Sequence, residues 1–321
     1  MDALSDVLRA VRLSGAFFFD VQAHCPWVAE TPQGKTVVDA MFPGSDHLVC
    51  YHLIMHGSCW LELEGEPPVK LSAGDIIVLP QGDTHVLTTE LGKRKTPEMS
   101  MYRVPDDGQL PVSISMGTDG GDEAHFVCGF LGCDSRPYNP LLTALPRIIH
   151  IKDHASGALG AYFRAALAES KGRMGGASML GRISELMFVD VIRRHLESLP
   201  ADRTNWLSGL RDAYVGRALM ALHADPARDW TLESLAQEAA LSRSAFAERF
   251  NQYVGHPPMQ YLANWRMQLA TNYLRNGSES IASVANRVGY DSEAAFSRAF
   301  KKAVGAPPSE WRTTHVTGNA A

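Results

Sequence analysis

The period of the hydrophobic pattern changes along the chain near residue 135. Before that point apolar and polar residues alternate in short runs, of which 47–55 and 60–64 are the clearest, and turns rich in glycine and proline separate the runs. Alternation with a period of two predicts β-strands that bury one face. Many short strands at regular spacing predict an antiparallel sandwich or barrel, and the glycine- and aspartate-rich segment 108–122 predicts a loop.

From about residue 139 onward the apolar residues recur with the spacing of an α-helix. We expect helices over 158–170 and 178–199. The second helix has a broad apolar surface, because Phe188 and Val189 lie off its main apolar stripe. It therefore either packs entirely within its own subunit or forms a dimer interface. The polar stretch 200–207 has no hydrophobic period and predicts a linker.

Between Arg211 and Arg312 the sequence repeats itself at a period of about 50 residues. In each copy a short apolar stripe leads through a turn into a second helix, which carries two phenylalanines one helical turn apart. These phenylalanines are Phe246, Phe250, Phe296 and Phe300. Each copy closes with a glycine and then two prolines, a pattern typical of a helix end. The repeat predicts two helix-turn-helix units, at about 231–255 and 281–305.

One long amphipathic helix is expected between the two units, over 259–275. Such a helix holds the units at a fixed separation, so that both second helices reach successive major grooves of DNA. The predicted fold class is α+β with several domains. Residues 1–200 form the first domain, with a β-barrel to about 135 and then linker or dimerisation helices. A linker follows at 201–210, and an all-α domain occupies 211–315.

The two matched units and their connecting helix resemble the DNA-binding domain of the AraC/XylS family of bacterial transcription regulators. The resemblance implies that early and middle residues of each second helix face the DNA. Carried over position by position, these residues are Arg243, Ser244, Ala247, Glu248, Ser292, Glu293, Ala294, Ser297 and Arg298. Arg298 best suits base reading, since arginine makes a bidentate contact with guanine. Glu248 and Glu293 are equally well explained as solvated helix surface.

The run from Gly74 to His85 fits the pattern Gly-x5-Pro-x-Gly-x2-His. It resembles the second motif of the cupin family, and it also resembles the cupin sensor domain of a subset of AraC-type regulators. The resemblance implies a small β-barrel, cupin-like, with His85 aimed into its interior. The first cupin motif is largely absent, because the His-x-His pair and the glutamate of the metal-binding members are missing. The barrel is therefore predicted to sense a small molecule, a metal or an oxidant.

Candidate metal ligands in the first domain are His52, His85 and Cys128. His52 shares one face of a predicted strand with Cys50, and that face is expected to point inward with His85. Imidazole and thiolate both suit zinc, so zinc is the cofactor that this set would favour. The alternative is that all three are ordinary core or pocket residues.

A different candidate for sensing is Cys25. It follows His24 directly, and a neighbouring imidazolium lowers the pKa of a thiol. We therefore consider Cys25 as a redox residue.

Charge is distributed unevenly along a chain whose net charge is −5. The stretch from Arg211 to Arg312 has 12 Lys and Arg against 10 Asp and Glu, so it is mildly positive and the rest is acidic. This asymmetry is compatible with DNA binding in the C-terminal third. Five scattered cysteines, no long apolar run and no signal-peptide pattern predict a cytoplasmic protein without a membrane partner.

The predicted function is therefore sequence-specific, DNA-binding transcription regulation. The expected partners are double-stranded promoter or operator DNA, a small effector, a second copy of the chain and, for an activator, RNA polymerase. The alternative is a cupin-type metalloenzyme with a non-catalytic helical appendage. The missing His-x-His pair and glutamate argue against that alternative, so we expect no enzymatic activity.

Overall fold

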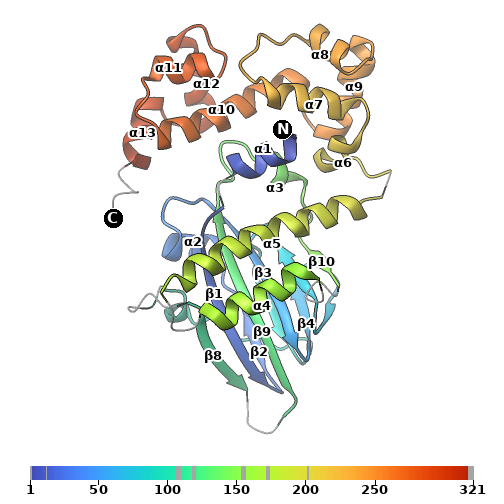
Figure 1. Ribbon diagram of the computed structural model, residues 1–321, viewed down its shortest axis with the longest axis vertical. Coiled ribbons are helices and arrows are strands. Elements are labelled where there is room, and N and C mark those ends of the chain that lie inside the picture. The colour runs from blue at the N-terminus through green and yellow to red at the C-terminus, as the bar shows by residue number, and fades with distance from the viewer. Residues whose placement is uncertain are drawn as a thin grey trace. The chain divides into compact units, whose positions relative to one another are not determined.

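The computed structural model describes the chain except for residues 1, 12, 104, 106–109, 118–120, 153–156, 171–173, 201 and 317–321. The chain forms two compact units. The β-rich unit consists of Leu13–Cys133 and Pro146–Glu197, and the helical unit consists of Met1–Arg12, Asp134–Leu145 and Ser198–Ala321. The elements of both units are labelled in Figure 1.

The β-rich unit contains two sheets. The six-stranded sheet has the order β10-β6-β3-β9-β1-β8, and the four-stranded sheet has the order β2-β7-β4-β5. The strands of the first are β1 (Ser14–His24), β3 (His47–His56), β6 (Ile76–Leu79), β8 (Val112–Gly117), β9 (Glu123–Cys133) and β10 (Ile149–Ile151). Those of the second are β2 (Val28–Glu30), β4 (Ser58–Leu63), β5 (Val69–Ser72) and β7 (His85–Thr88).

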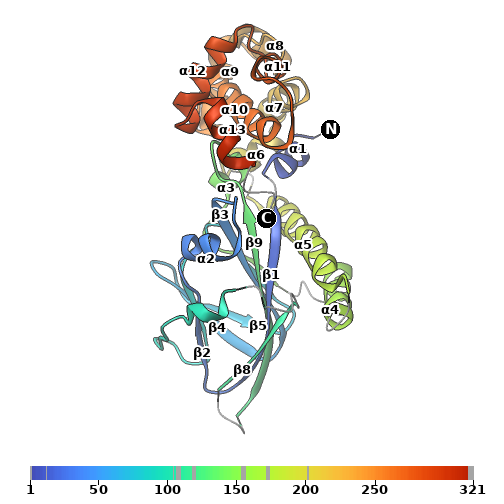
Figure 2. The same ribbon diagram turned by 90° about the vertical axis from the view of Figure 1, so that its left-hand side faces the viewer.

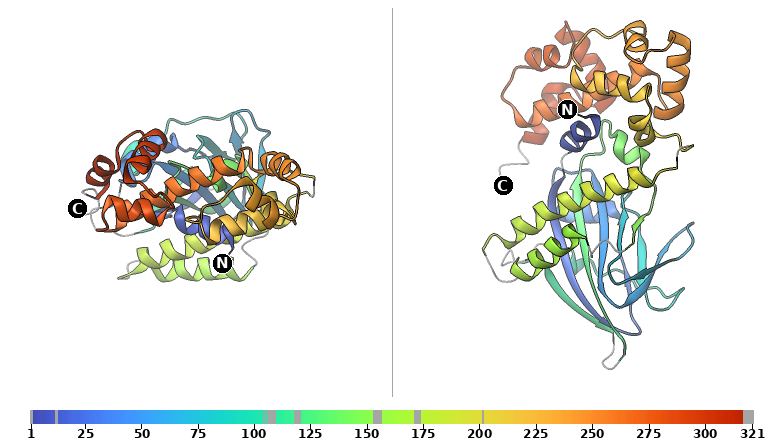
Figure 3. Two further views of the ribbon diagram at one scale, coloured as in Figure 1. Left: turned by 90° about the horizontal axis from the view of Figure 1, so that it is seen from above. Right: turned by 45° about the vertical axis from the view of Figure 1, so that its right-hand side comes forward.

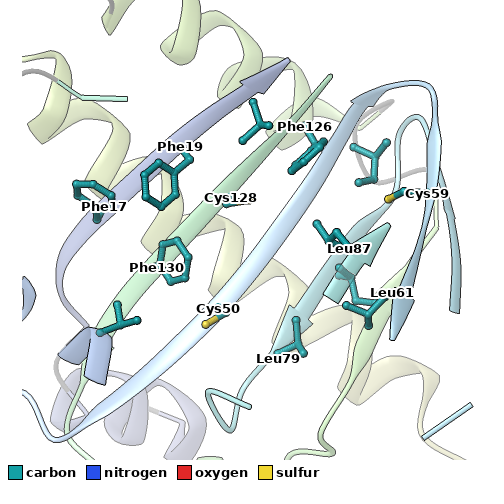
Figure 4. Close-up of a cluster of buried hydrophobic side chains, with 14 of the residues drawn as sticks. Phe17, Phe19, Cys50, Cys59, Leu61, Leu79, Leu87, Phe126, Cys128 and Phe130 are labelled. Carbon is teal, nitrogen blue, oxygen red and sulfur yellow. The ribbon is translucent and has the colours of Figure 1, made fainter. Parts of the chain in front are cut away.

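A hydrophobic core lies between these two sheets, and Figure 4 shows part of it. Every second residue of β1 enters it, as Phe17 and Phe19 do, because successive side chains of a strand point to opposite faces. Phe126 and Phe130 enter from β9, and Leu87 enters from β7 of the other sheet. The predicted β-rich, cupin-like domain is confirmed, and in the described residues its strands form two facing sheets and not one closed barrel.

Helices α4 (Ala158–Ser170) and α5 (Gly176–Ser198) pack on the outer face of the six-stranded sheet (Figures 2 and 3). The hydroxyl of Tyr51 on β3 lies 2.7 Å from that of Ser184 on α5. Gly129 makes room for this contact, because a Cβ there would lie 2.0 Å from the Tyr51 ring. A helix α2 (Gly34–Met41) and a short 3-10 helix η1 (Met99–Met101) complete the unit.

The helical unit is organised around α10 (Pro258–Asn276), which runs between two groups of helices in Figure 1. One group contains α6 (Trp206–Arg211), α7 (Val215–Ala224), α8 (Leu232–Glu238) and α9 (Arg243–Val254). The other contains α11 (Ile281–Arg287), α12 (Glu293–Val304) and α13 (Pro308–Val316). The N-terminal half of the chain adds α1 (Ala3–Ala10) and α3 (Pro140–Ala144) to this unit.

Most predicted elements are confirmed, and one expectation needs correction. The loop expected at 108–122 contains strand β8, which pairs in parallel with β1, although parts of this segment lie outside the described residues. The strand has a regular alternation of Val112, Ile114 and Met116 with serines, but the glycines and aspartates on both sides of it favoured a loop. Asp134–Leu145 and the segment around α1 belong to the compact unit of the C-terminal helices. In the described part of the chain no helix is long and apolar enough to cross a membrane.

Candidate DNA-binding surface and sensor pocket

The first helix-turn-helix unit consists of α8 and α9. A capping box between Thr231 and Ser234 starts α8. Ser242 caps α9, and its side chain accepts a hydrogen bond from the Ala245 N–H at 3.4 Å. The helix ends at Gly255 with φ of 76°, a left-handed conformation that favours glycine. Local sequence therefore sets both ends of this recognition helix.

The second unit, α11 and α12, repeats the same construction. Ser292 caps α12, and its side chain accepts a hydrogen bond from the Ala295 N–H. The turn needs Gly289, because a Cβ there would lie 2.6 Å from the Ala227 carbonyl oxygen and its φ is 82°. Gly305 ends the helix with φ of 93°. The two units thus share one local design.

Each recognition helix is anchored by its two phenylalanines. Phe246, Phe250, Phe296 and Phe300 are all 0% exposed. Their ring centroids lie 5.5 Å apart in the first helix and 5.6 Å apart in the second. Because one face of each helix is committed to the core, the opposite face is presented outward.

The residues that the AraC resemblance assigns to DNA lie on these outward faces. Arg243, Ser244, Glu248, Ser292, Glu293, Ala294 and Arg298 are exposed, while Ala247 and Ser297 are half-buried. Arg243 forms an ion pair with Glu233 at 2.8 Å, whereas Arg298 forms none in the part of the chain that the structure describes. Lys301 and Lys302, one turn beyond Arg298, are also exposed and were not singled out from the sequence.

Helix α10 fixes the second unit to the loop that precedes the first. The Arg266 guanidinium donates to the Pro226 carbonyl oxygen at 2.8 Å and to the Arg228 carbonyl oxygen at 2.9 Å. It also donates to the Gly289 carbonyl oxygen in the turn of the second unit, at 3.1 Å. The Arg266 side chain of the connecting helix therefore binds backbone carbonyls of both the loop before the first helix-turn-helix unit and the turn of the second.

In the β-rich unit the structure brings His52, His85 and Cys128 together. His52 and Cys128 face each other on the neighbouring strands β3 and β9, and His85 reaches them from β7 of the other sheet. His52 Nδ1 lies 3.0 Å from Cys128 Sγ, and His52 Nε2 lies 2.6 Å from His85 Nε2. The two histidines are buried, and 9% of Cys128 is exposed.

His85, His52 and Cys128 form a row of hydrogen-bonding side chains, and the hydrogen-bond geometry shows which atom of each pair carries the proton. The Asp83 carbonyl oxygen, 2.7 Å from His85 Nδ1, only accepts, so His85 Nδ1 carries a proton. Burial lowers the pKa of His85 to about 4 and holds the pKa of His52 below its usual range, so both rings are neutral near pH 7. His52 Nε2 therefore donates to His85 Nε2. His52 Nδ1 accepts the Cys128 S–H, which burial preserves by raising the thiol pKa.

This arrangement does not fit a single zinc ion. The His52 ring lies between its two partners and uses a different nitrogen toward each, so the three donors form a row and do not surround one point. Over the described residues, no group of three histidine, cysteine or carboxylate side chains is placed to hold a metal. We therefore derive no chemistry from a metal at this position.

A cavity of about 200 Å³ lies beside this row, with His52 and Cys128 in its wall. Its apolar wall is formed mainly by Phe19, Val21, Leu87, Ile114, Phe126 and Phe130. Polar and charged residues that the sequence did not single out also line it, among them Thr31, Tyr102, Glu30, Lys95 and Glu98. Thr31 Oγ1 lies 3.1 Å from His85 Nε2, and burial raises the pKa of Tyr102, so the phenol stays neutral. No motif marks Thr31 and Tyr102, because long-range contacts place them: Thr31 hydrogen-bonds to His85 of β7, and the Tyr102 ring packs against Phe19 and Phe130.

Cys25 lies in a different environment from the one expected. Burial and the Asp122 carboxylate raise the pKa of Cys25, which is the opposite of the shift that His24 suggested. Cys25 lines a second cleft together with His56 and Cys59. The neighbouring imidazole therefore gives no reason to treat Cys25 as an activated thiol.

Two helix-turn-helix units on one connecting helix, joined in one chain to a β-sandwich with an internal cavity, define a DNA-binding transcription regulator with a sensor domain. Residues 2–197 match the family described as "Cupin", and residues 235–314 match the family described as "Helix-turn-helix domain". The chain belongs to the AraC-like family of transcription regulators.

Two relatives illustrate this membership over nearly the whole chain. A putative AraC-like transcription regulator of Streptomyces lividans is 34% identical over 322 residues, which cover 97% of this chain and 98% of the relative. The transcriptional regulator AlkR of Acinetobacter baylyi is 30% identical over 318 residues, covering 97% and 99%. Among solved structures, the DNA-binding domain of AdpA in complex with a target DNA is 28% identical with a TM-score of 0.32, covering 34% of this chain and 96% of that one.

Proposed function

We propose that the exposed faces of α9 and α12 read an operator sequence in the major groove of DNA. The observation that carries the proposal is the burial of all four phenylalanines, which turns the opposite face of each helix outward. The residues proposed to face DNA are Arg243, Ser244, Ala247, Glu248, Ser292, Glu293, Ala294, Ser297 and Arg298. DNA is the natural partner because both helices belong to units that match this family.

The test is a selection with random double-stranded DNA. Fragments retained by the purified full chain are sequenced, and a common motif with two half-sites about one helical turn apart is the expected result. A pool without enriched sequence after several rounds would contradict sequence-specific binding. The variant Arg298→Ala, which keeps the four phenylalanine anchors, is put through the same DNA selection as the matched control. It should lose preference at one base position only.

We propose that the cavity beside His52 and Cys128 binds the effector, and that the effector is a compact, mostly apolar organic molecule. An apolar cavity of roughly 150 Å³ holds a benzene molecule, so about 200 Å³ suits a single ring or a short chain. The Tyr102 hydroxyl and the Cys128 sulfur are polar groups in the wall that a ligand can contact. The His85, His52 and Cys128 side chains carry no charge near pH 7, and the charged residues of the wall are Glu30, Lys95 and Glu98.

Calorimetry with a panel of small ring compounds and short-chain alcohols tests this proposal. A compound of matching size is expected to bind the wild type, and Leu87→Trp, which fills the cavity, is expected to abolish the binding. Leu63→Met, a substitution at a buried residue outside the cavity wall, is the control for core repacking. Equal binding to wild type and Leu87→Trp would place the effector elsewhere.

We further propose that the protein forms a homodimer through α5. One face of α5 is buried, but Met179 and Leu186 on the other are 40% and 56% exposed. The neighbouring α4 exposes Tyr162 in addition. Sedimentation of the wild type at micromolar concentration is expected to give a dimer, and Leu186→Glu is expected to shift it toward monomer. A wild-type monomer under these conditions would contradict the proposal.

The remaining parts of the proposed function follow from DNA binding. A regulator acts where its operator is, so we place the protein in the cytoplasm, and RNA polymerase is its further partner wherever it activates. We propose that the sandwich binds its ligand without converting it. The reason is that the donor row does not fit a metal, and the relatives named above are regulators.

A further inference from the structure

Two segments from the N-terminal half of the chain pack within the helical unit. Helix α1 contacts α7 and α10, and α3 contacts α6 (Figure 1). The first segment immediately precedes β1, and the second immediately follows β9. The two central strands that border the effector cavity are therefore each continued by a segment that is anchored to the DNA-binding helices.

Asp134 is the residue at which these segments meet α10. Its N–H donates to the Val11 carbonyl oxygen at 3.0 Å, and its own carbonyl oxygen accepts from the Asn139 side-chain amide at 2.9 Å. Its carboxylate forms an ion pair with Arg275 of α10 at 2.6 Å. The side chains of Asp134 and Arg275 are only 6% and 9% exposed, so this pair is shielded from solvent.

The same face of α10 offers two amides to these segments. Gln268 accepts from the Tyr138 N–H at 3.1 Å and donates to the Ala10 carbonyl oxygen at 3.4 Å, and Asn272 donates to that oxygen at 2.9 Å. Gln268, Asn272 and Arg275 are spaced four and three residues apart, so they form one stripe along the helix. The end of α1 and the start of the 134–145 segment bind to this stripe through hydrogen bonds and an ion pair. Because these contacts are directional, they fix one position of the two segments along α10.

We propose that this stripe is a coupling surface, and that Asp134 transmits changes in strand β9 to α10. Cys128, in the cavity wall, lies on β9, and Asp134 directly follows the last residue of that strand. Arg266 of α10 in turn holds backbone beside both helix-turn-helix units. A shift of β9 thus reaches the element that sets the spacing of the two recognition helices. The proposal goes beyond effector binding and depends only on the DNA binding of the family.

Coupling between two sites is reciprocal, so operator binding must alter β9 as much as β9 alters operator binding. The experiment therefore uses operator DNA from the selection as the probe. Hydrogen exchange of the full chain is measured with and without saturating operator. We expect exchange rates in peptides covering 123–133 to change by about fivefold or more on DNA binding. The double variant D134N/R275Q, which removes both charges and leaves no buried ion unpaired, is expected to lose this change while still binding DNA.

The control is D190N/R194Q, which removes an exposed i,i+4 ion pair on α5 and should leave the response as in wild type. Asn272→Ala provides a second variant that removes only an anchor of α1, and it is expected to weaken the response. Melting temperatures and operator affinity are measured on the same samples. A wild type whose β9 exchange ignores DNA would overturn the proposal, and so would D134N/R275Q or Asn272→Ala with an undiminished response. None of these results bears on which molecule fills the cavity.

Discussion

The two helix-turn-helix units share the same frame, which consists of the helix caps, the glycine ends and the phenylalanine anchors. Their reading faces, the outward faces of α9 and α12, have opposite charge patterns. Counting from the serine cap, Arg243 of the first unit corresponds to Glu293 of the second, and Glu248 corresponds to Arg298. The frame is repeated because capping, glycine ends and phenylalanine anchors are set by local chemistry. The residues of the reading face do not pack in the core, so their charges can differ between the units without loss of the fold. A regulator with two such faces is expected to read two different half-sites.

The surroundings of the two faces differ as well. Arg243 is engaged by Glu233, whereas α12 presents Arg298 together with Lys301 and Lys302. The second unit is therefore the more basic of the two, and we expect it to contribute more of the phosphate attraction. The following predictions test this comparison of the two units.

The largest effect is expected from the shared frame. Phe246→Ala and Phe296→Ala should each cost about 3–5 kcal/mol of unfolding free energy, because each removes a fully buried ring from a packed core. Chemical denaturation of the full chain measures this, with the milder Phe→Leu change at each site as the control. A variant with an unchanged melting temperature and lost operator binding would show that the ring contacts DNA.

A smaller effect is expected on the reading faces, and there the units should diverge. Arg298→Ala should weaken operator binding by about 1–3 kcal/mol and relax preference at one base position. Glu248→Ala, at the corresponding place in the first unit, should leave affinity equal or slightly higher, because it removes a negative charge near phosphate. Binding titrations on operator and scrambled DNA measure both. An equal loss on the two DNAs would reassign Arg298 to phosphate contact.

Acid should weaken the first unit before the second. Burial raises the pKa of Asp212, but hydrogen bonds from Arg249 and from two backbone N–H groups outweigh it and hold the pKa at about 2, below the ordinary 3.8. The position matching Arg249 in the second unit is Ala299. A lowered carboxyl pKa stabilises the fold above the unfolded-state pKa, and this stability is lost as pH falls from about 4 toward 2.

For the partly exposed pair the loss should be about 1–2 kcal/mol after allowing for solvent screening. Hydrogen exchange of α9 and α12 between pH 4.5 and 2.5 measures it unit by unit. In Asp212→Asn the difference between the two helices should largely vanish over this range. Equal acid sensitivity of α9 and α12 in the wild type would exclude the Asp212–Arg249 pair as its source.

The smallest effect concerns the ion pair on the first reading face. Glu233→Gln releases Arg243, and because the pair is exposed, the change in stability should stay below about 1 kcal/mol. Operator affinity at low salt should rise by at most about fivefold, and the dependence on salt should steepen, since one more cation is available to phosphate. Glu238→Gln serves as the control, because it removes another exposed carboxylate of α8 that pairs with Arg228 and not with a residue of the reading face. An unchanged salt dependence would mean that Arg243 points away from DNA.

The sequence by itself determined the elements whose causes are local. A serine cap, a glycine in a left-handed conformation and two phenylalanines one turn apart act within a few residues, so both helix-turn-helix units follow from the pattern. The inward direction of His85 also follows, because Pro80 and Gly82 set the turn before it and strand alternation does the rest.

Only the tertiary structure decided how distant residues combine. The order of the His52 row depends on which ring nitrogen meets which strand, and this needs the register of β3 against β9 and the approach of the second sheet. Thr31 and Tyr102 enter the cavity wall without any motif. Strand β8 is defined by its pairing with β1, since its short alternation lies within a segment whose glycines and aspartates favour a loop. The membership of α1 and Asp134 in the helical unit rests on contacts with Gln268, Asn272 and Arg275. Those partners lie more than a hundred residues away, beyond the reach of any local pattern.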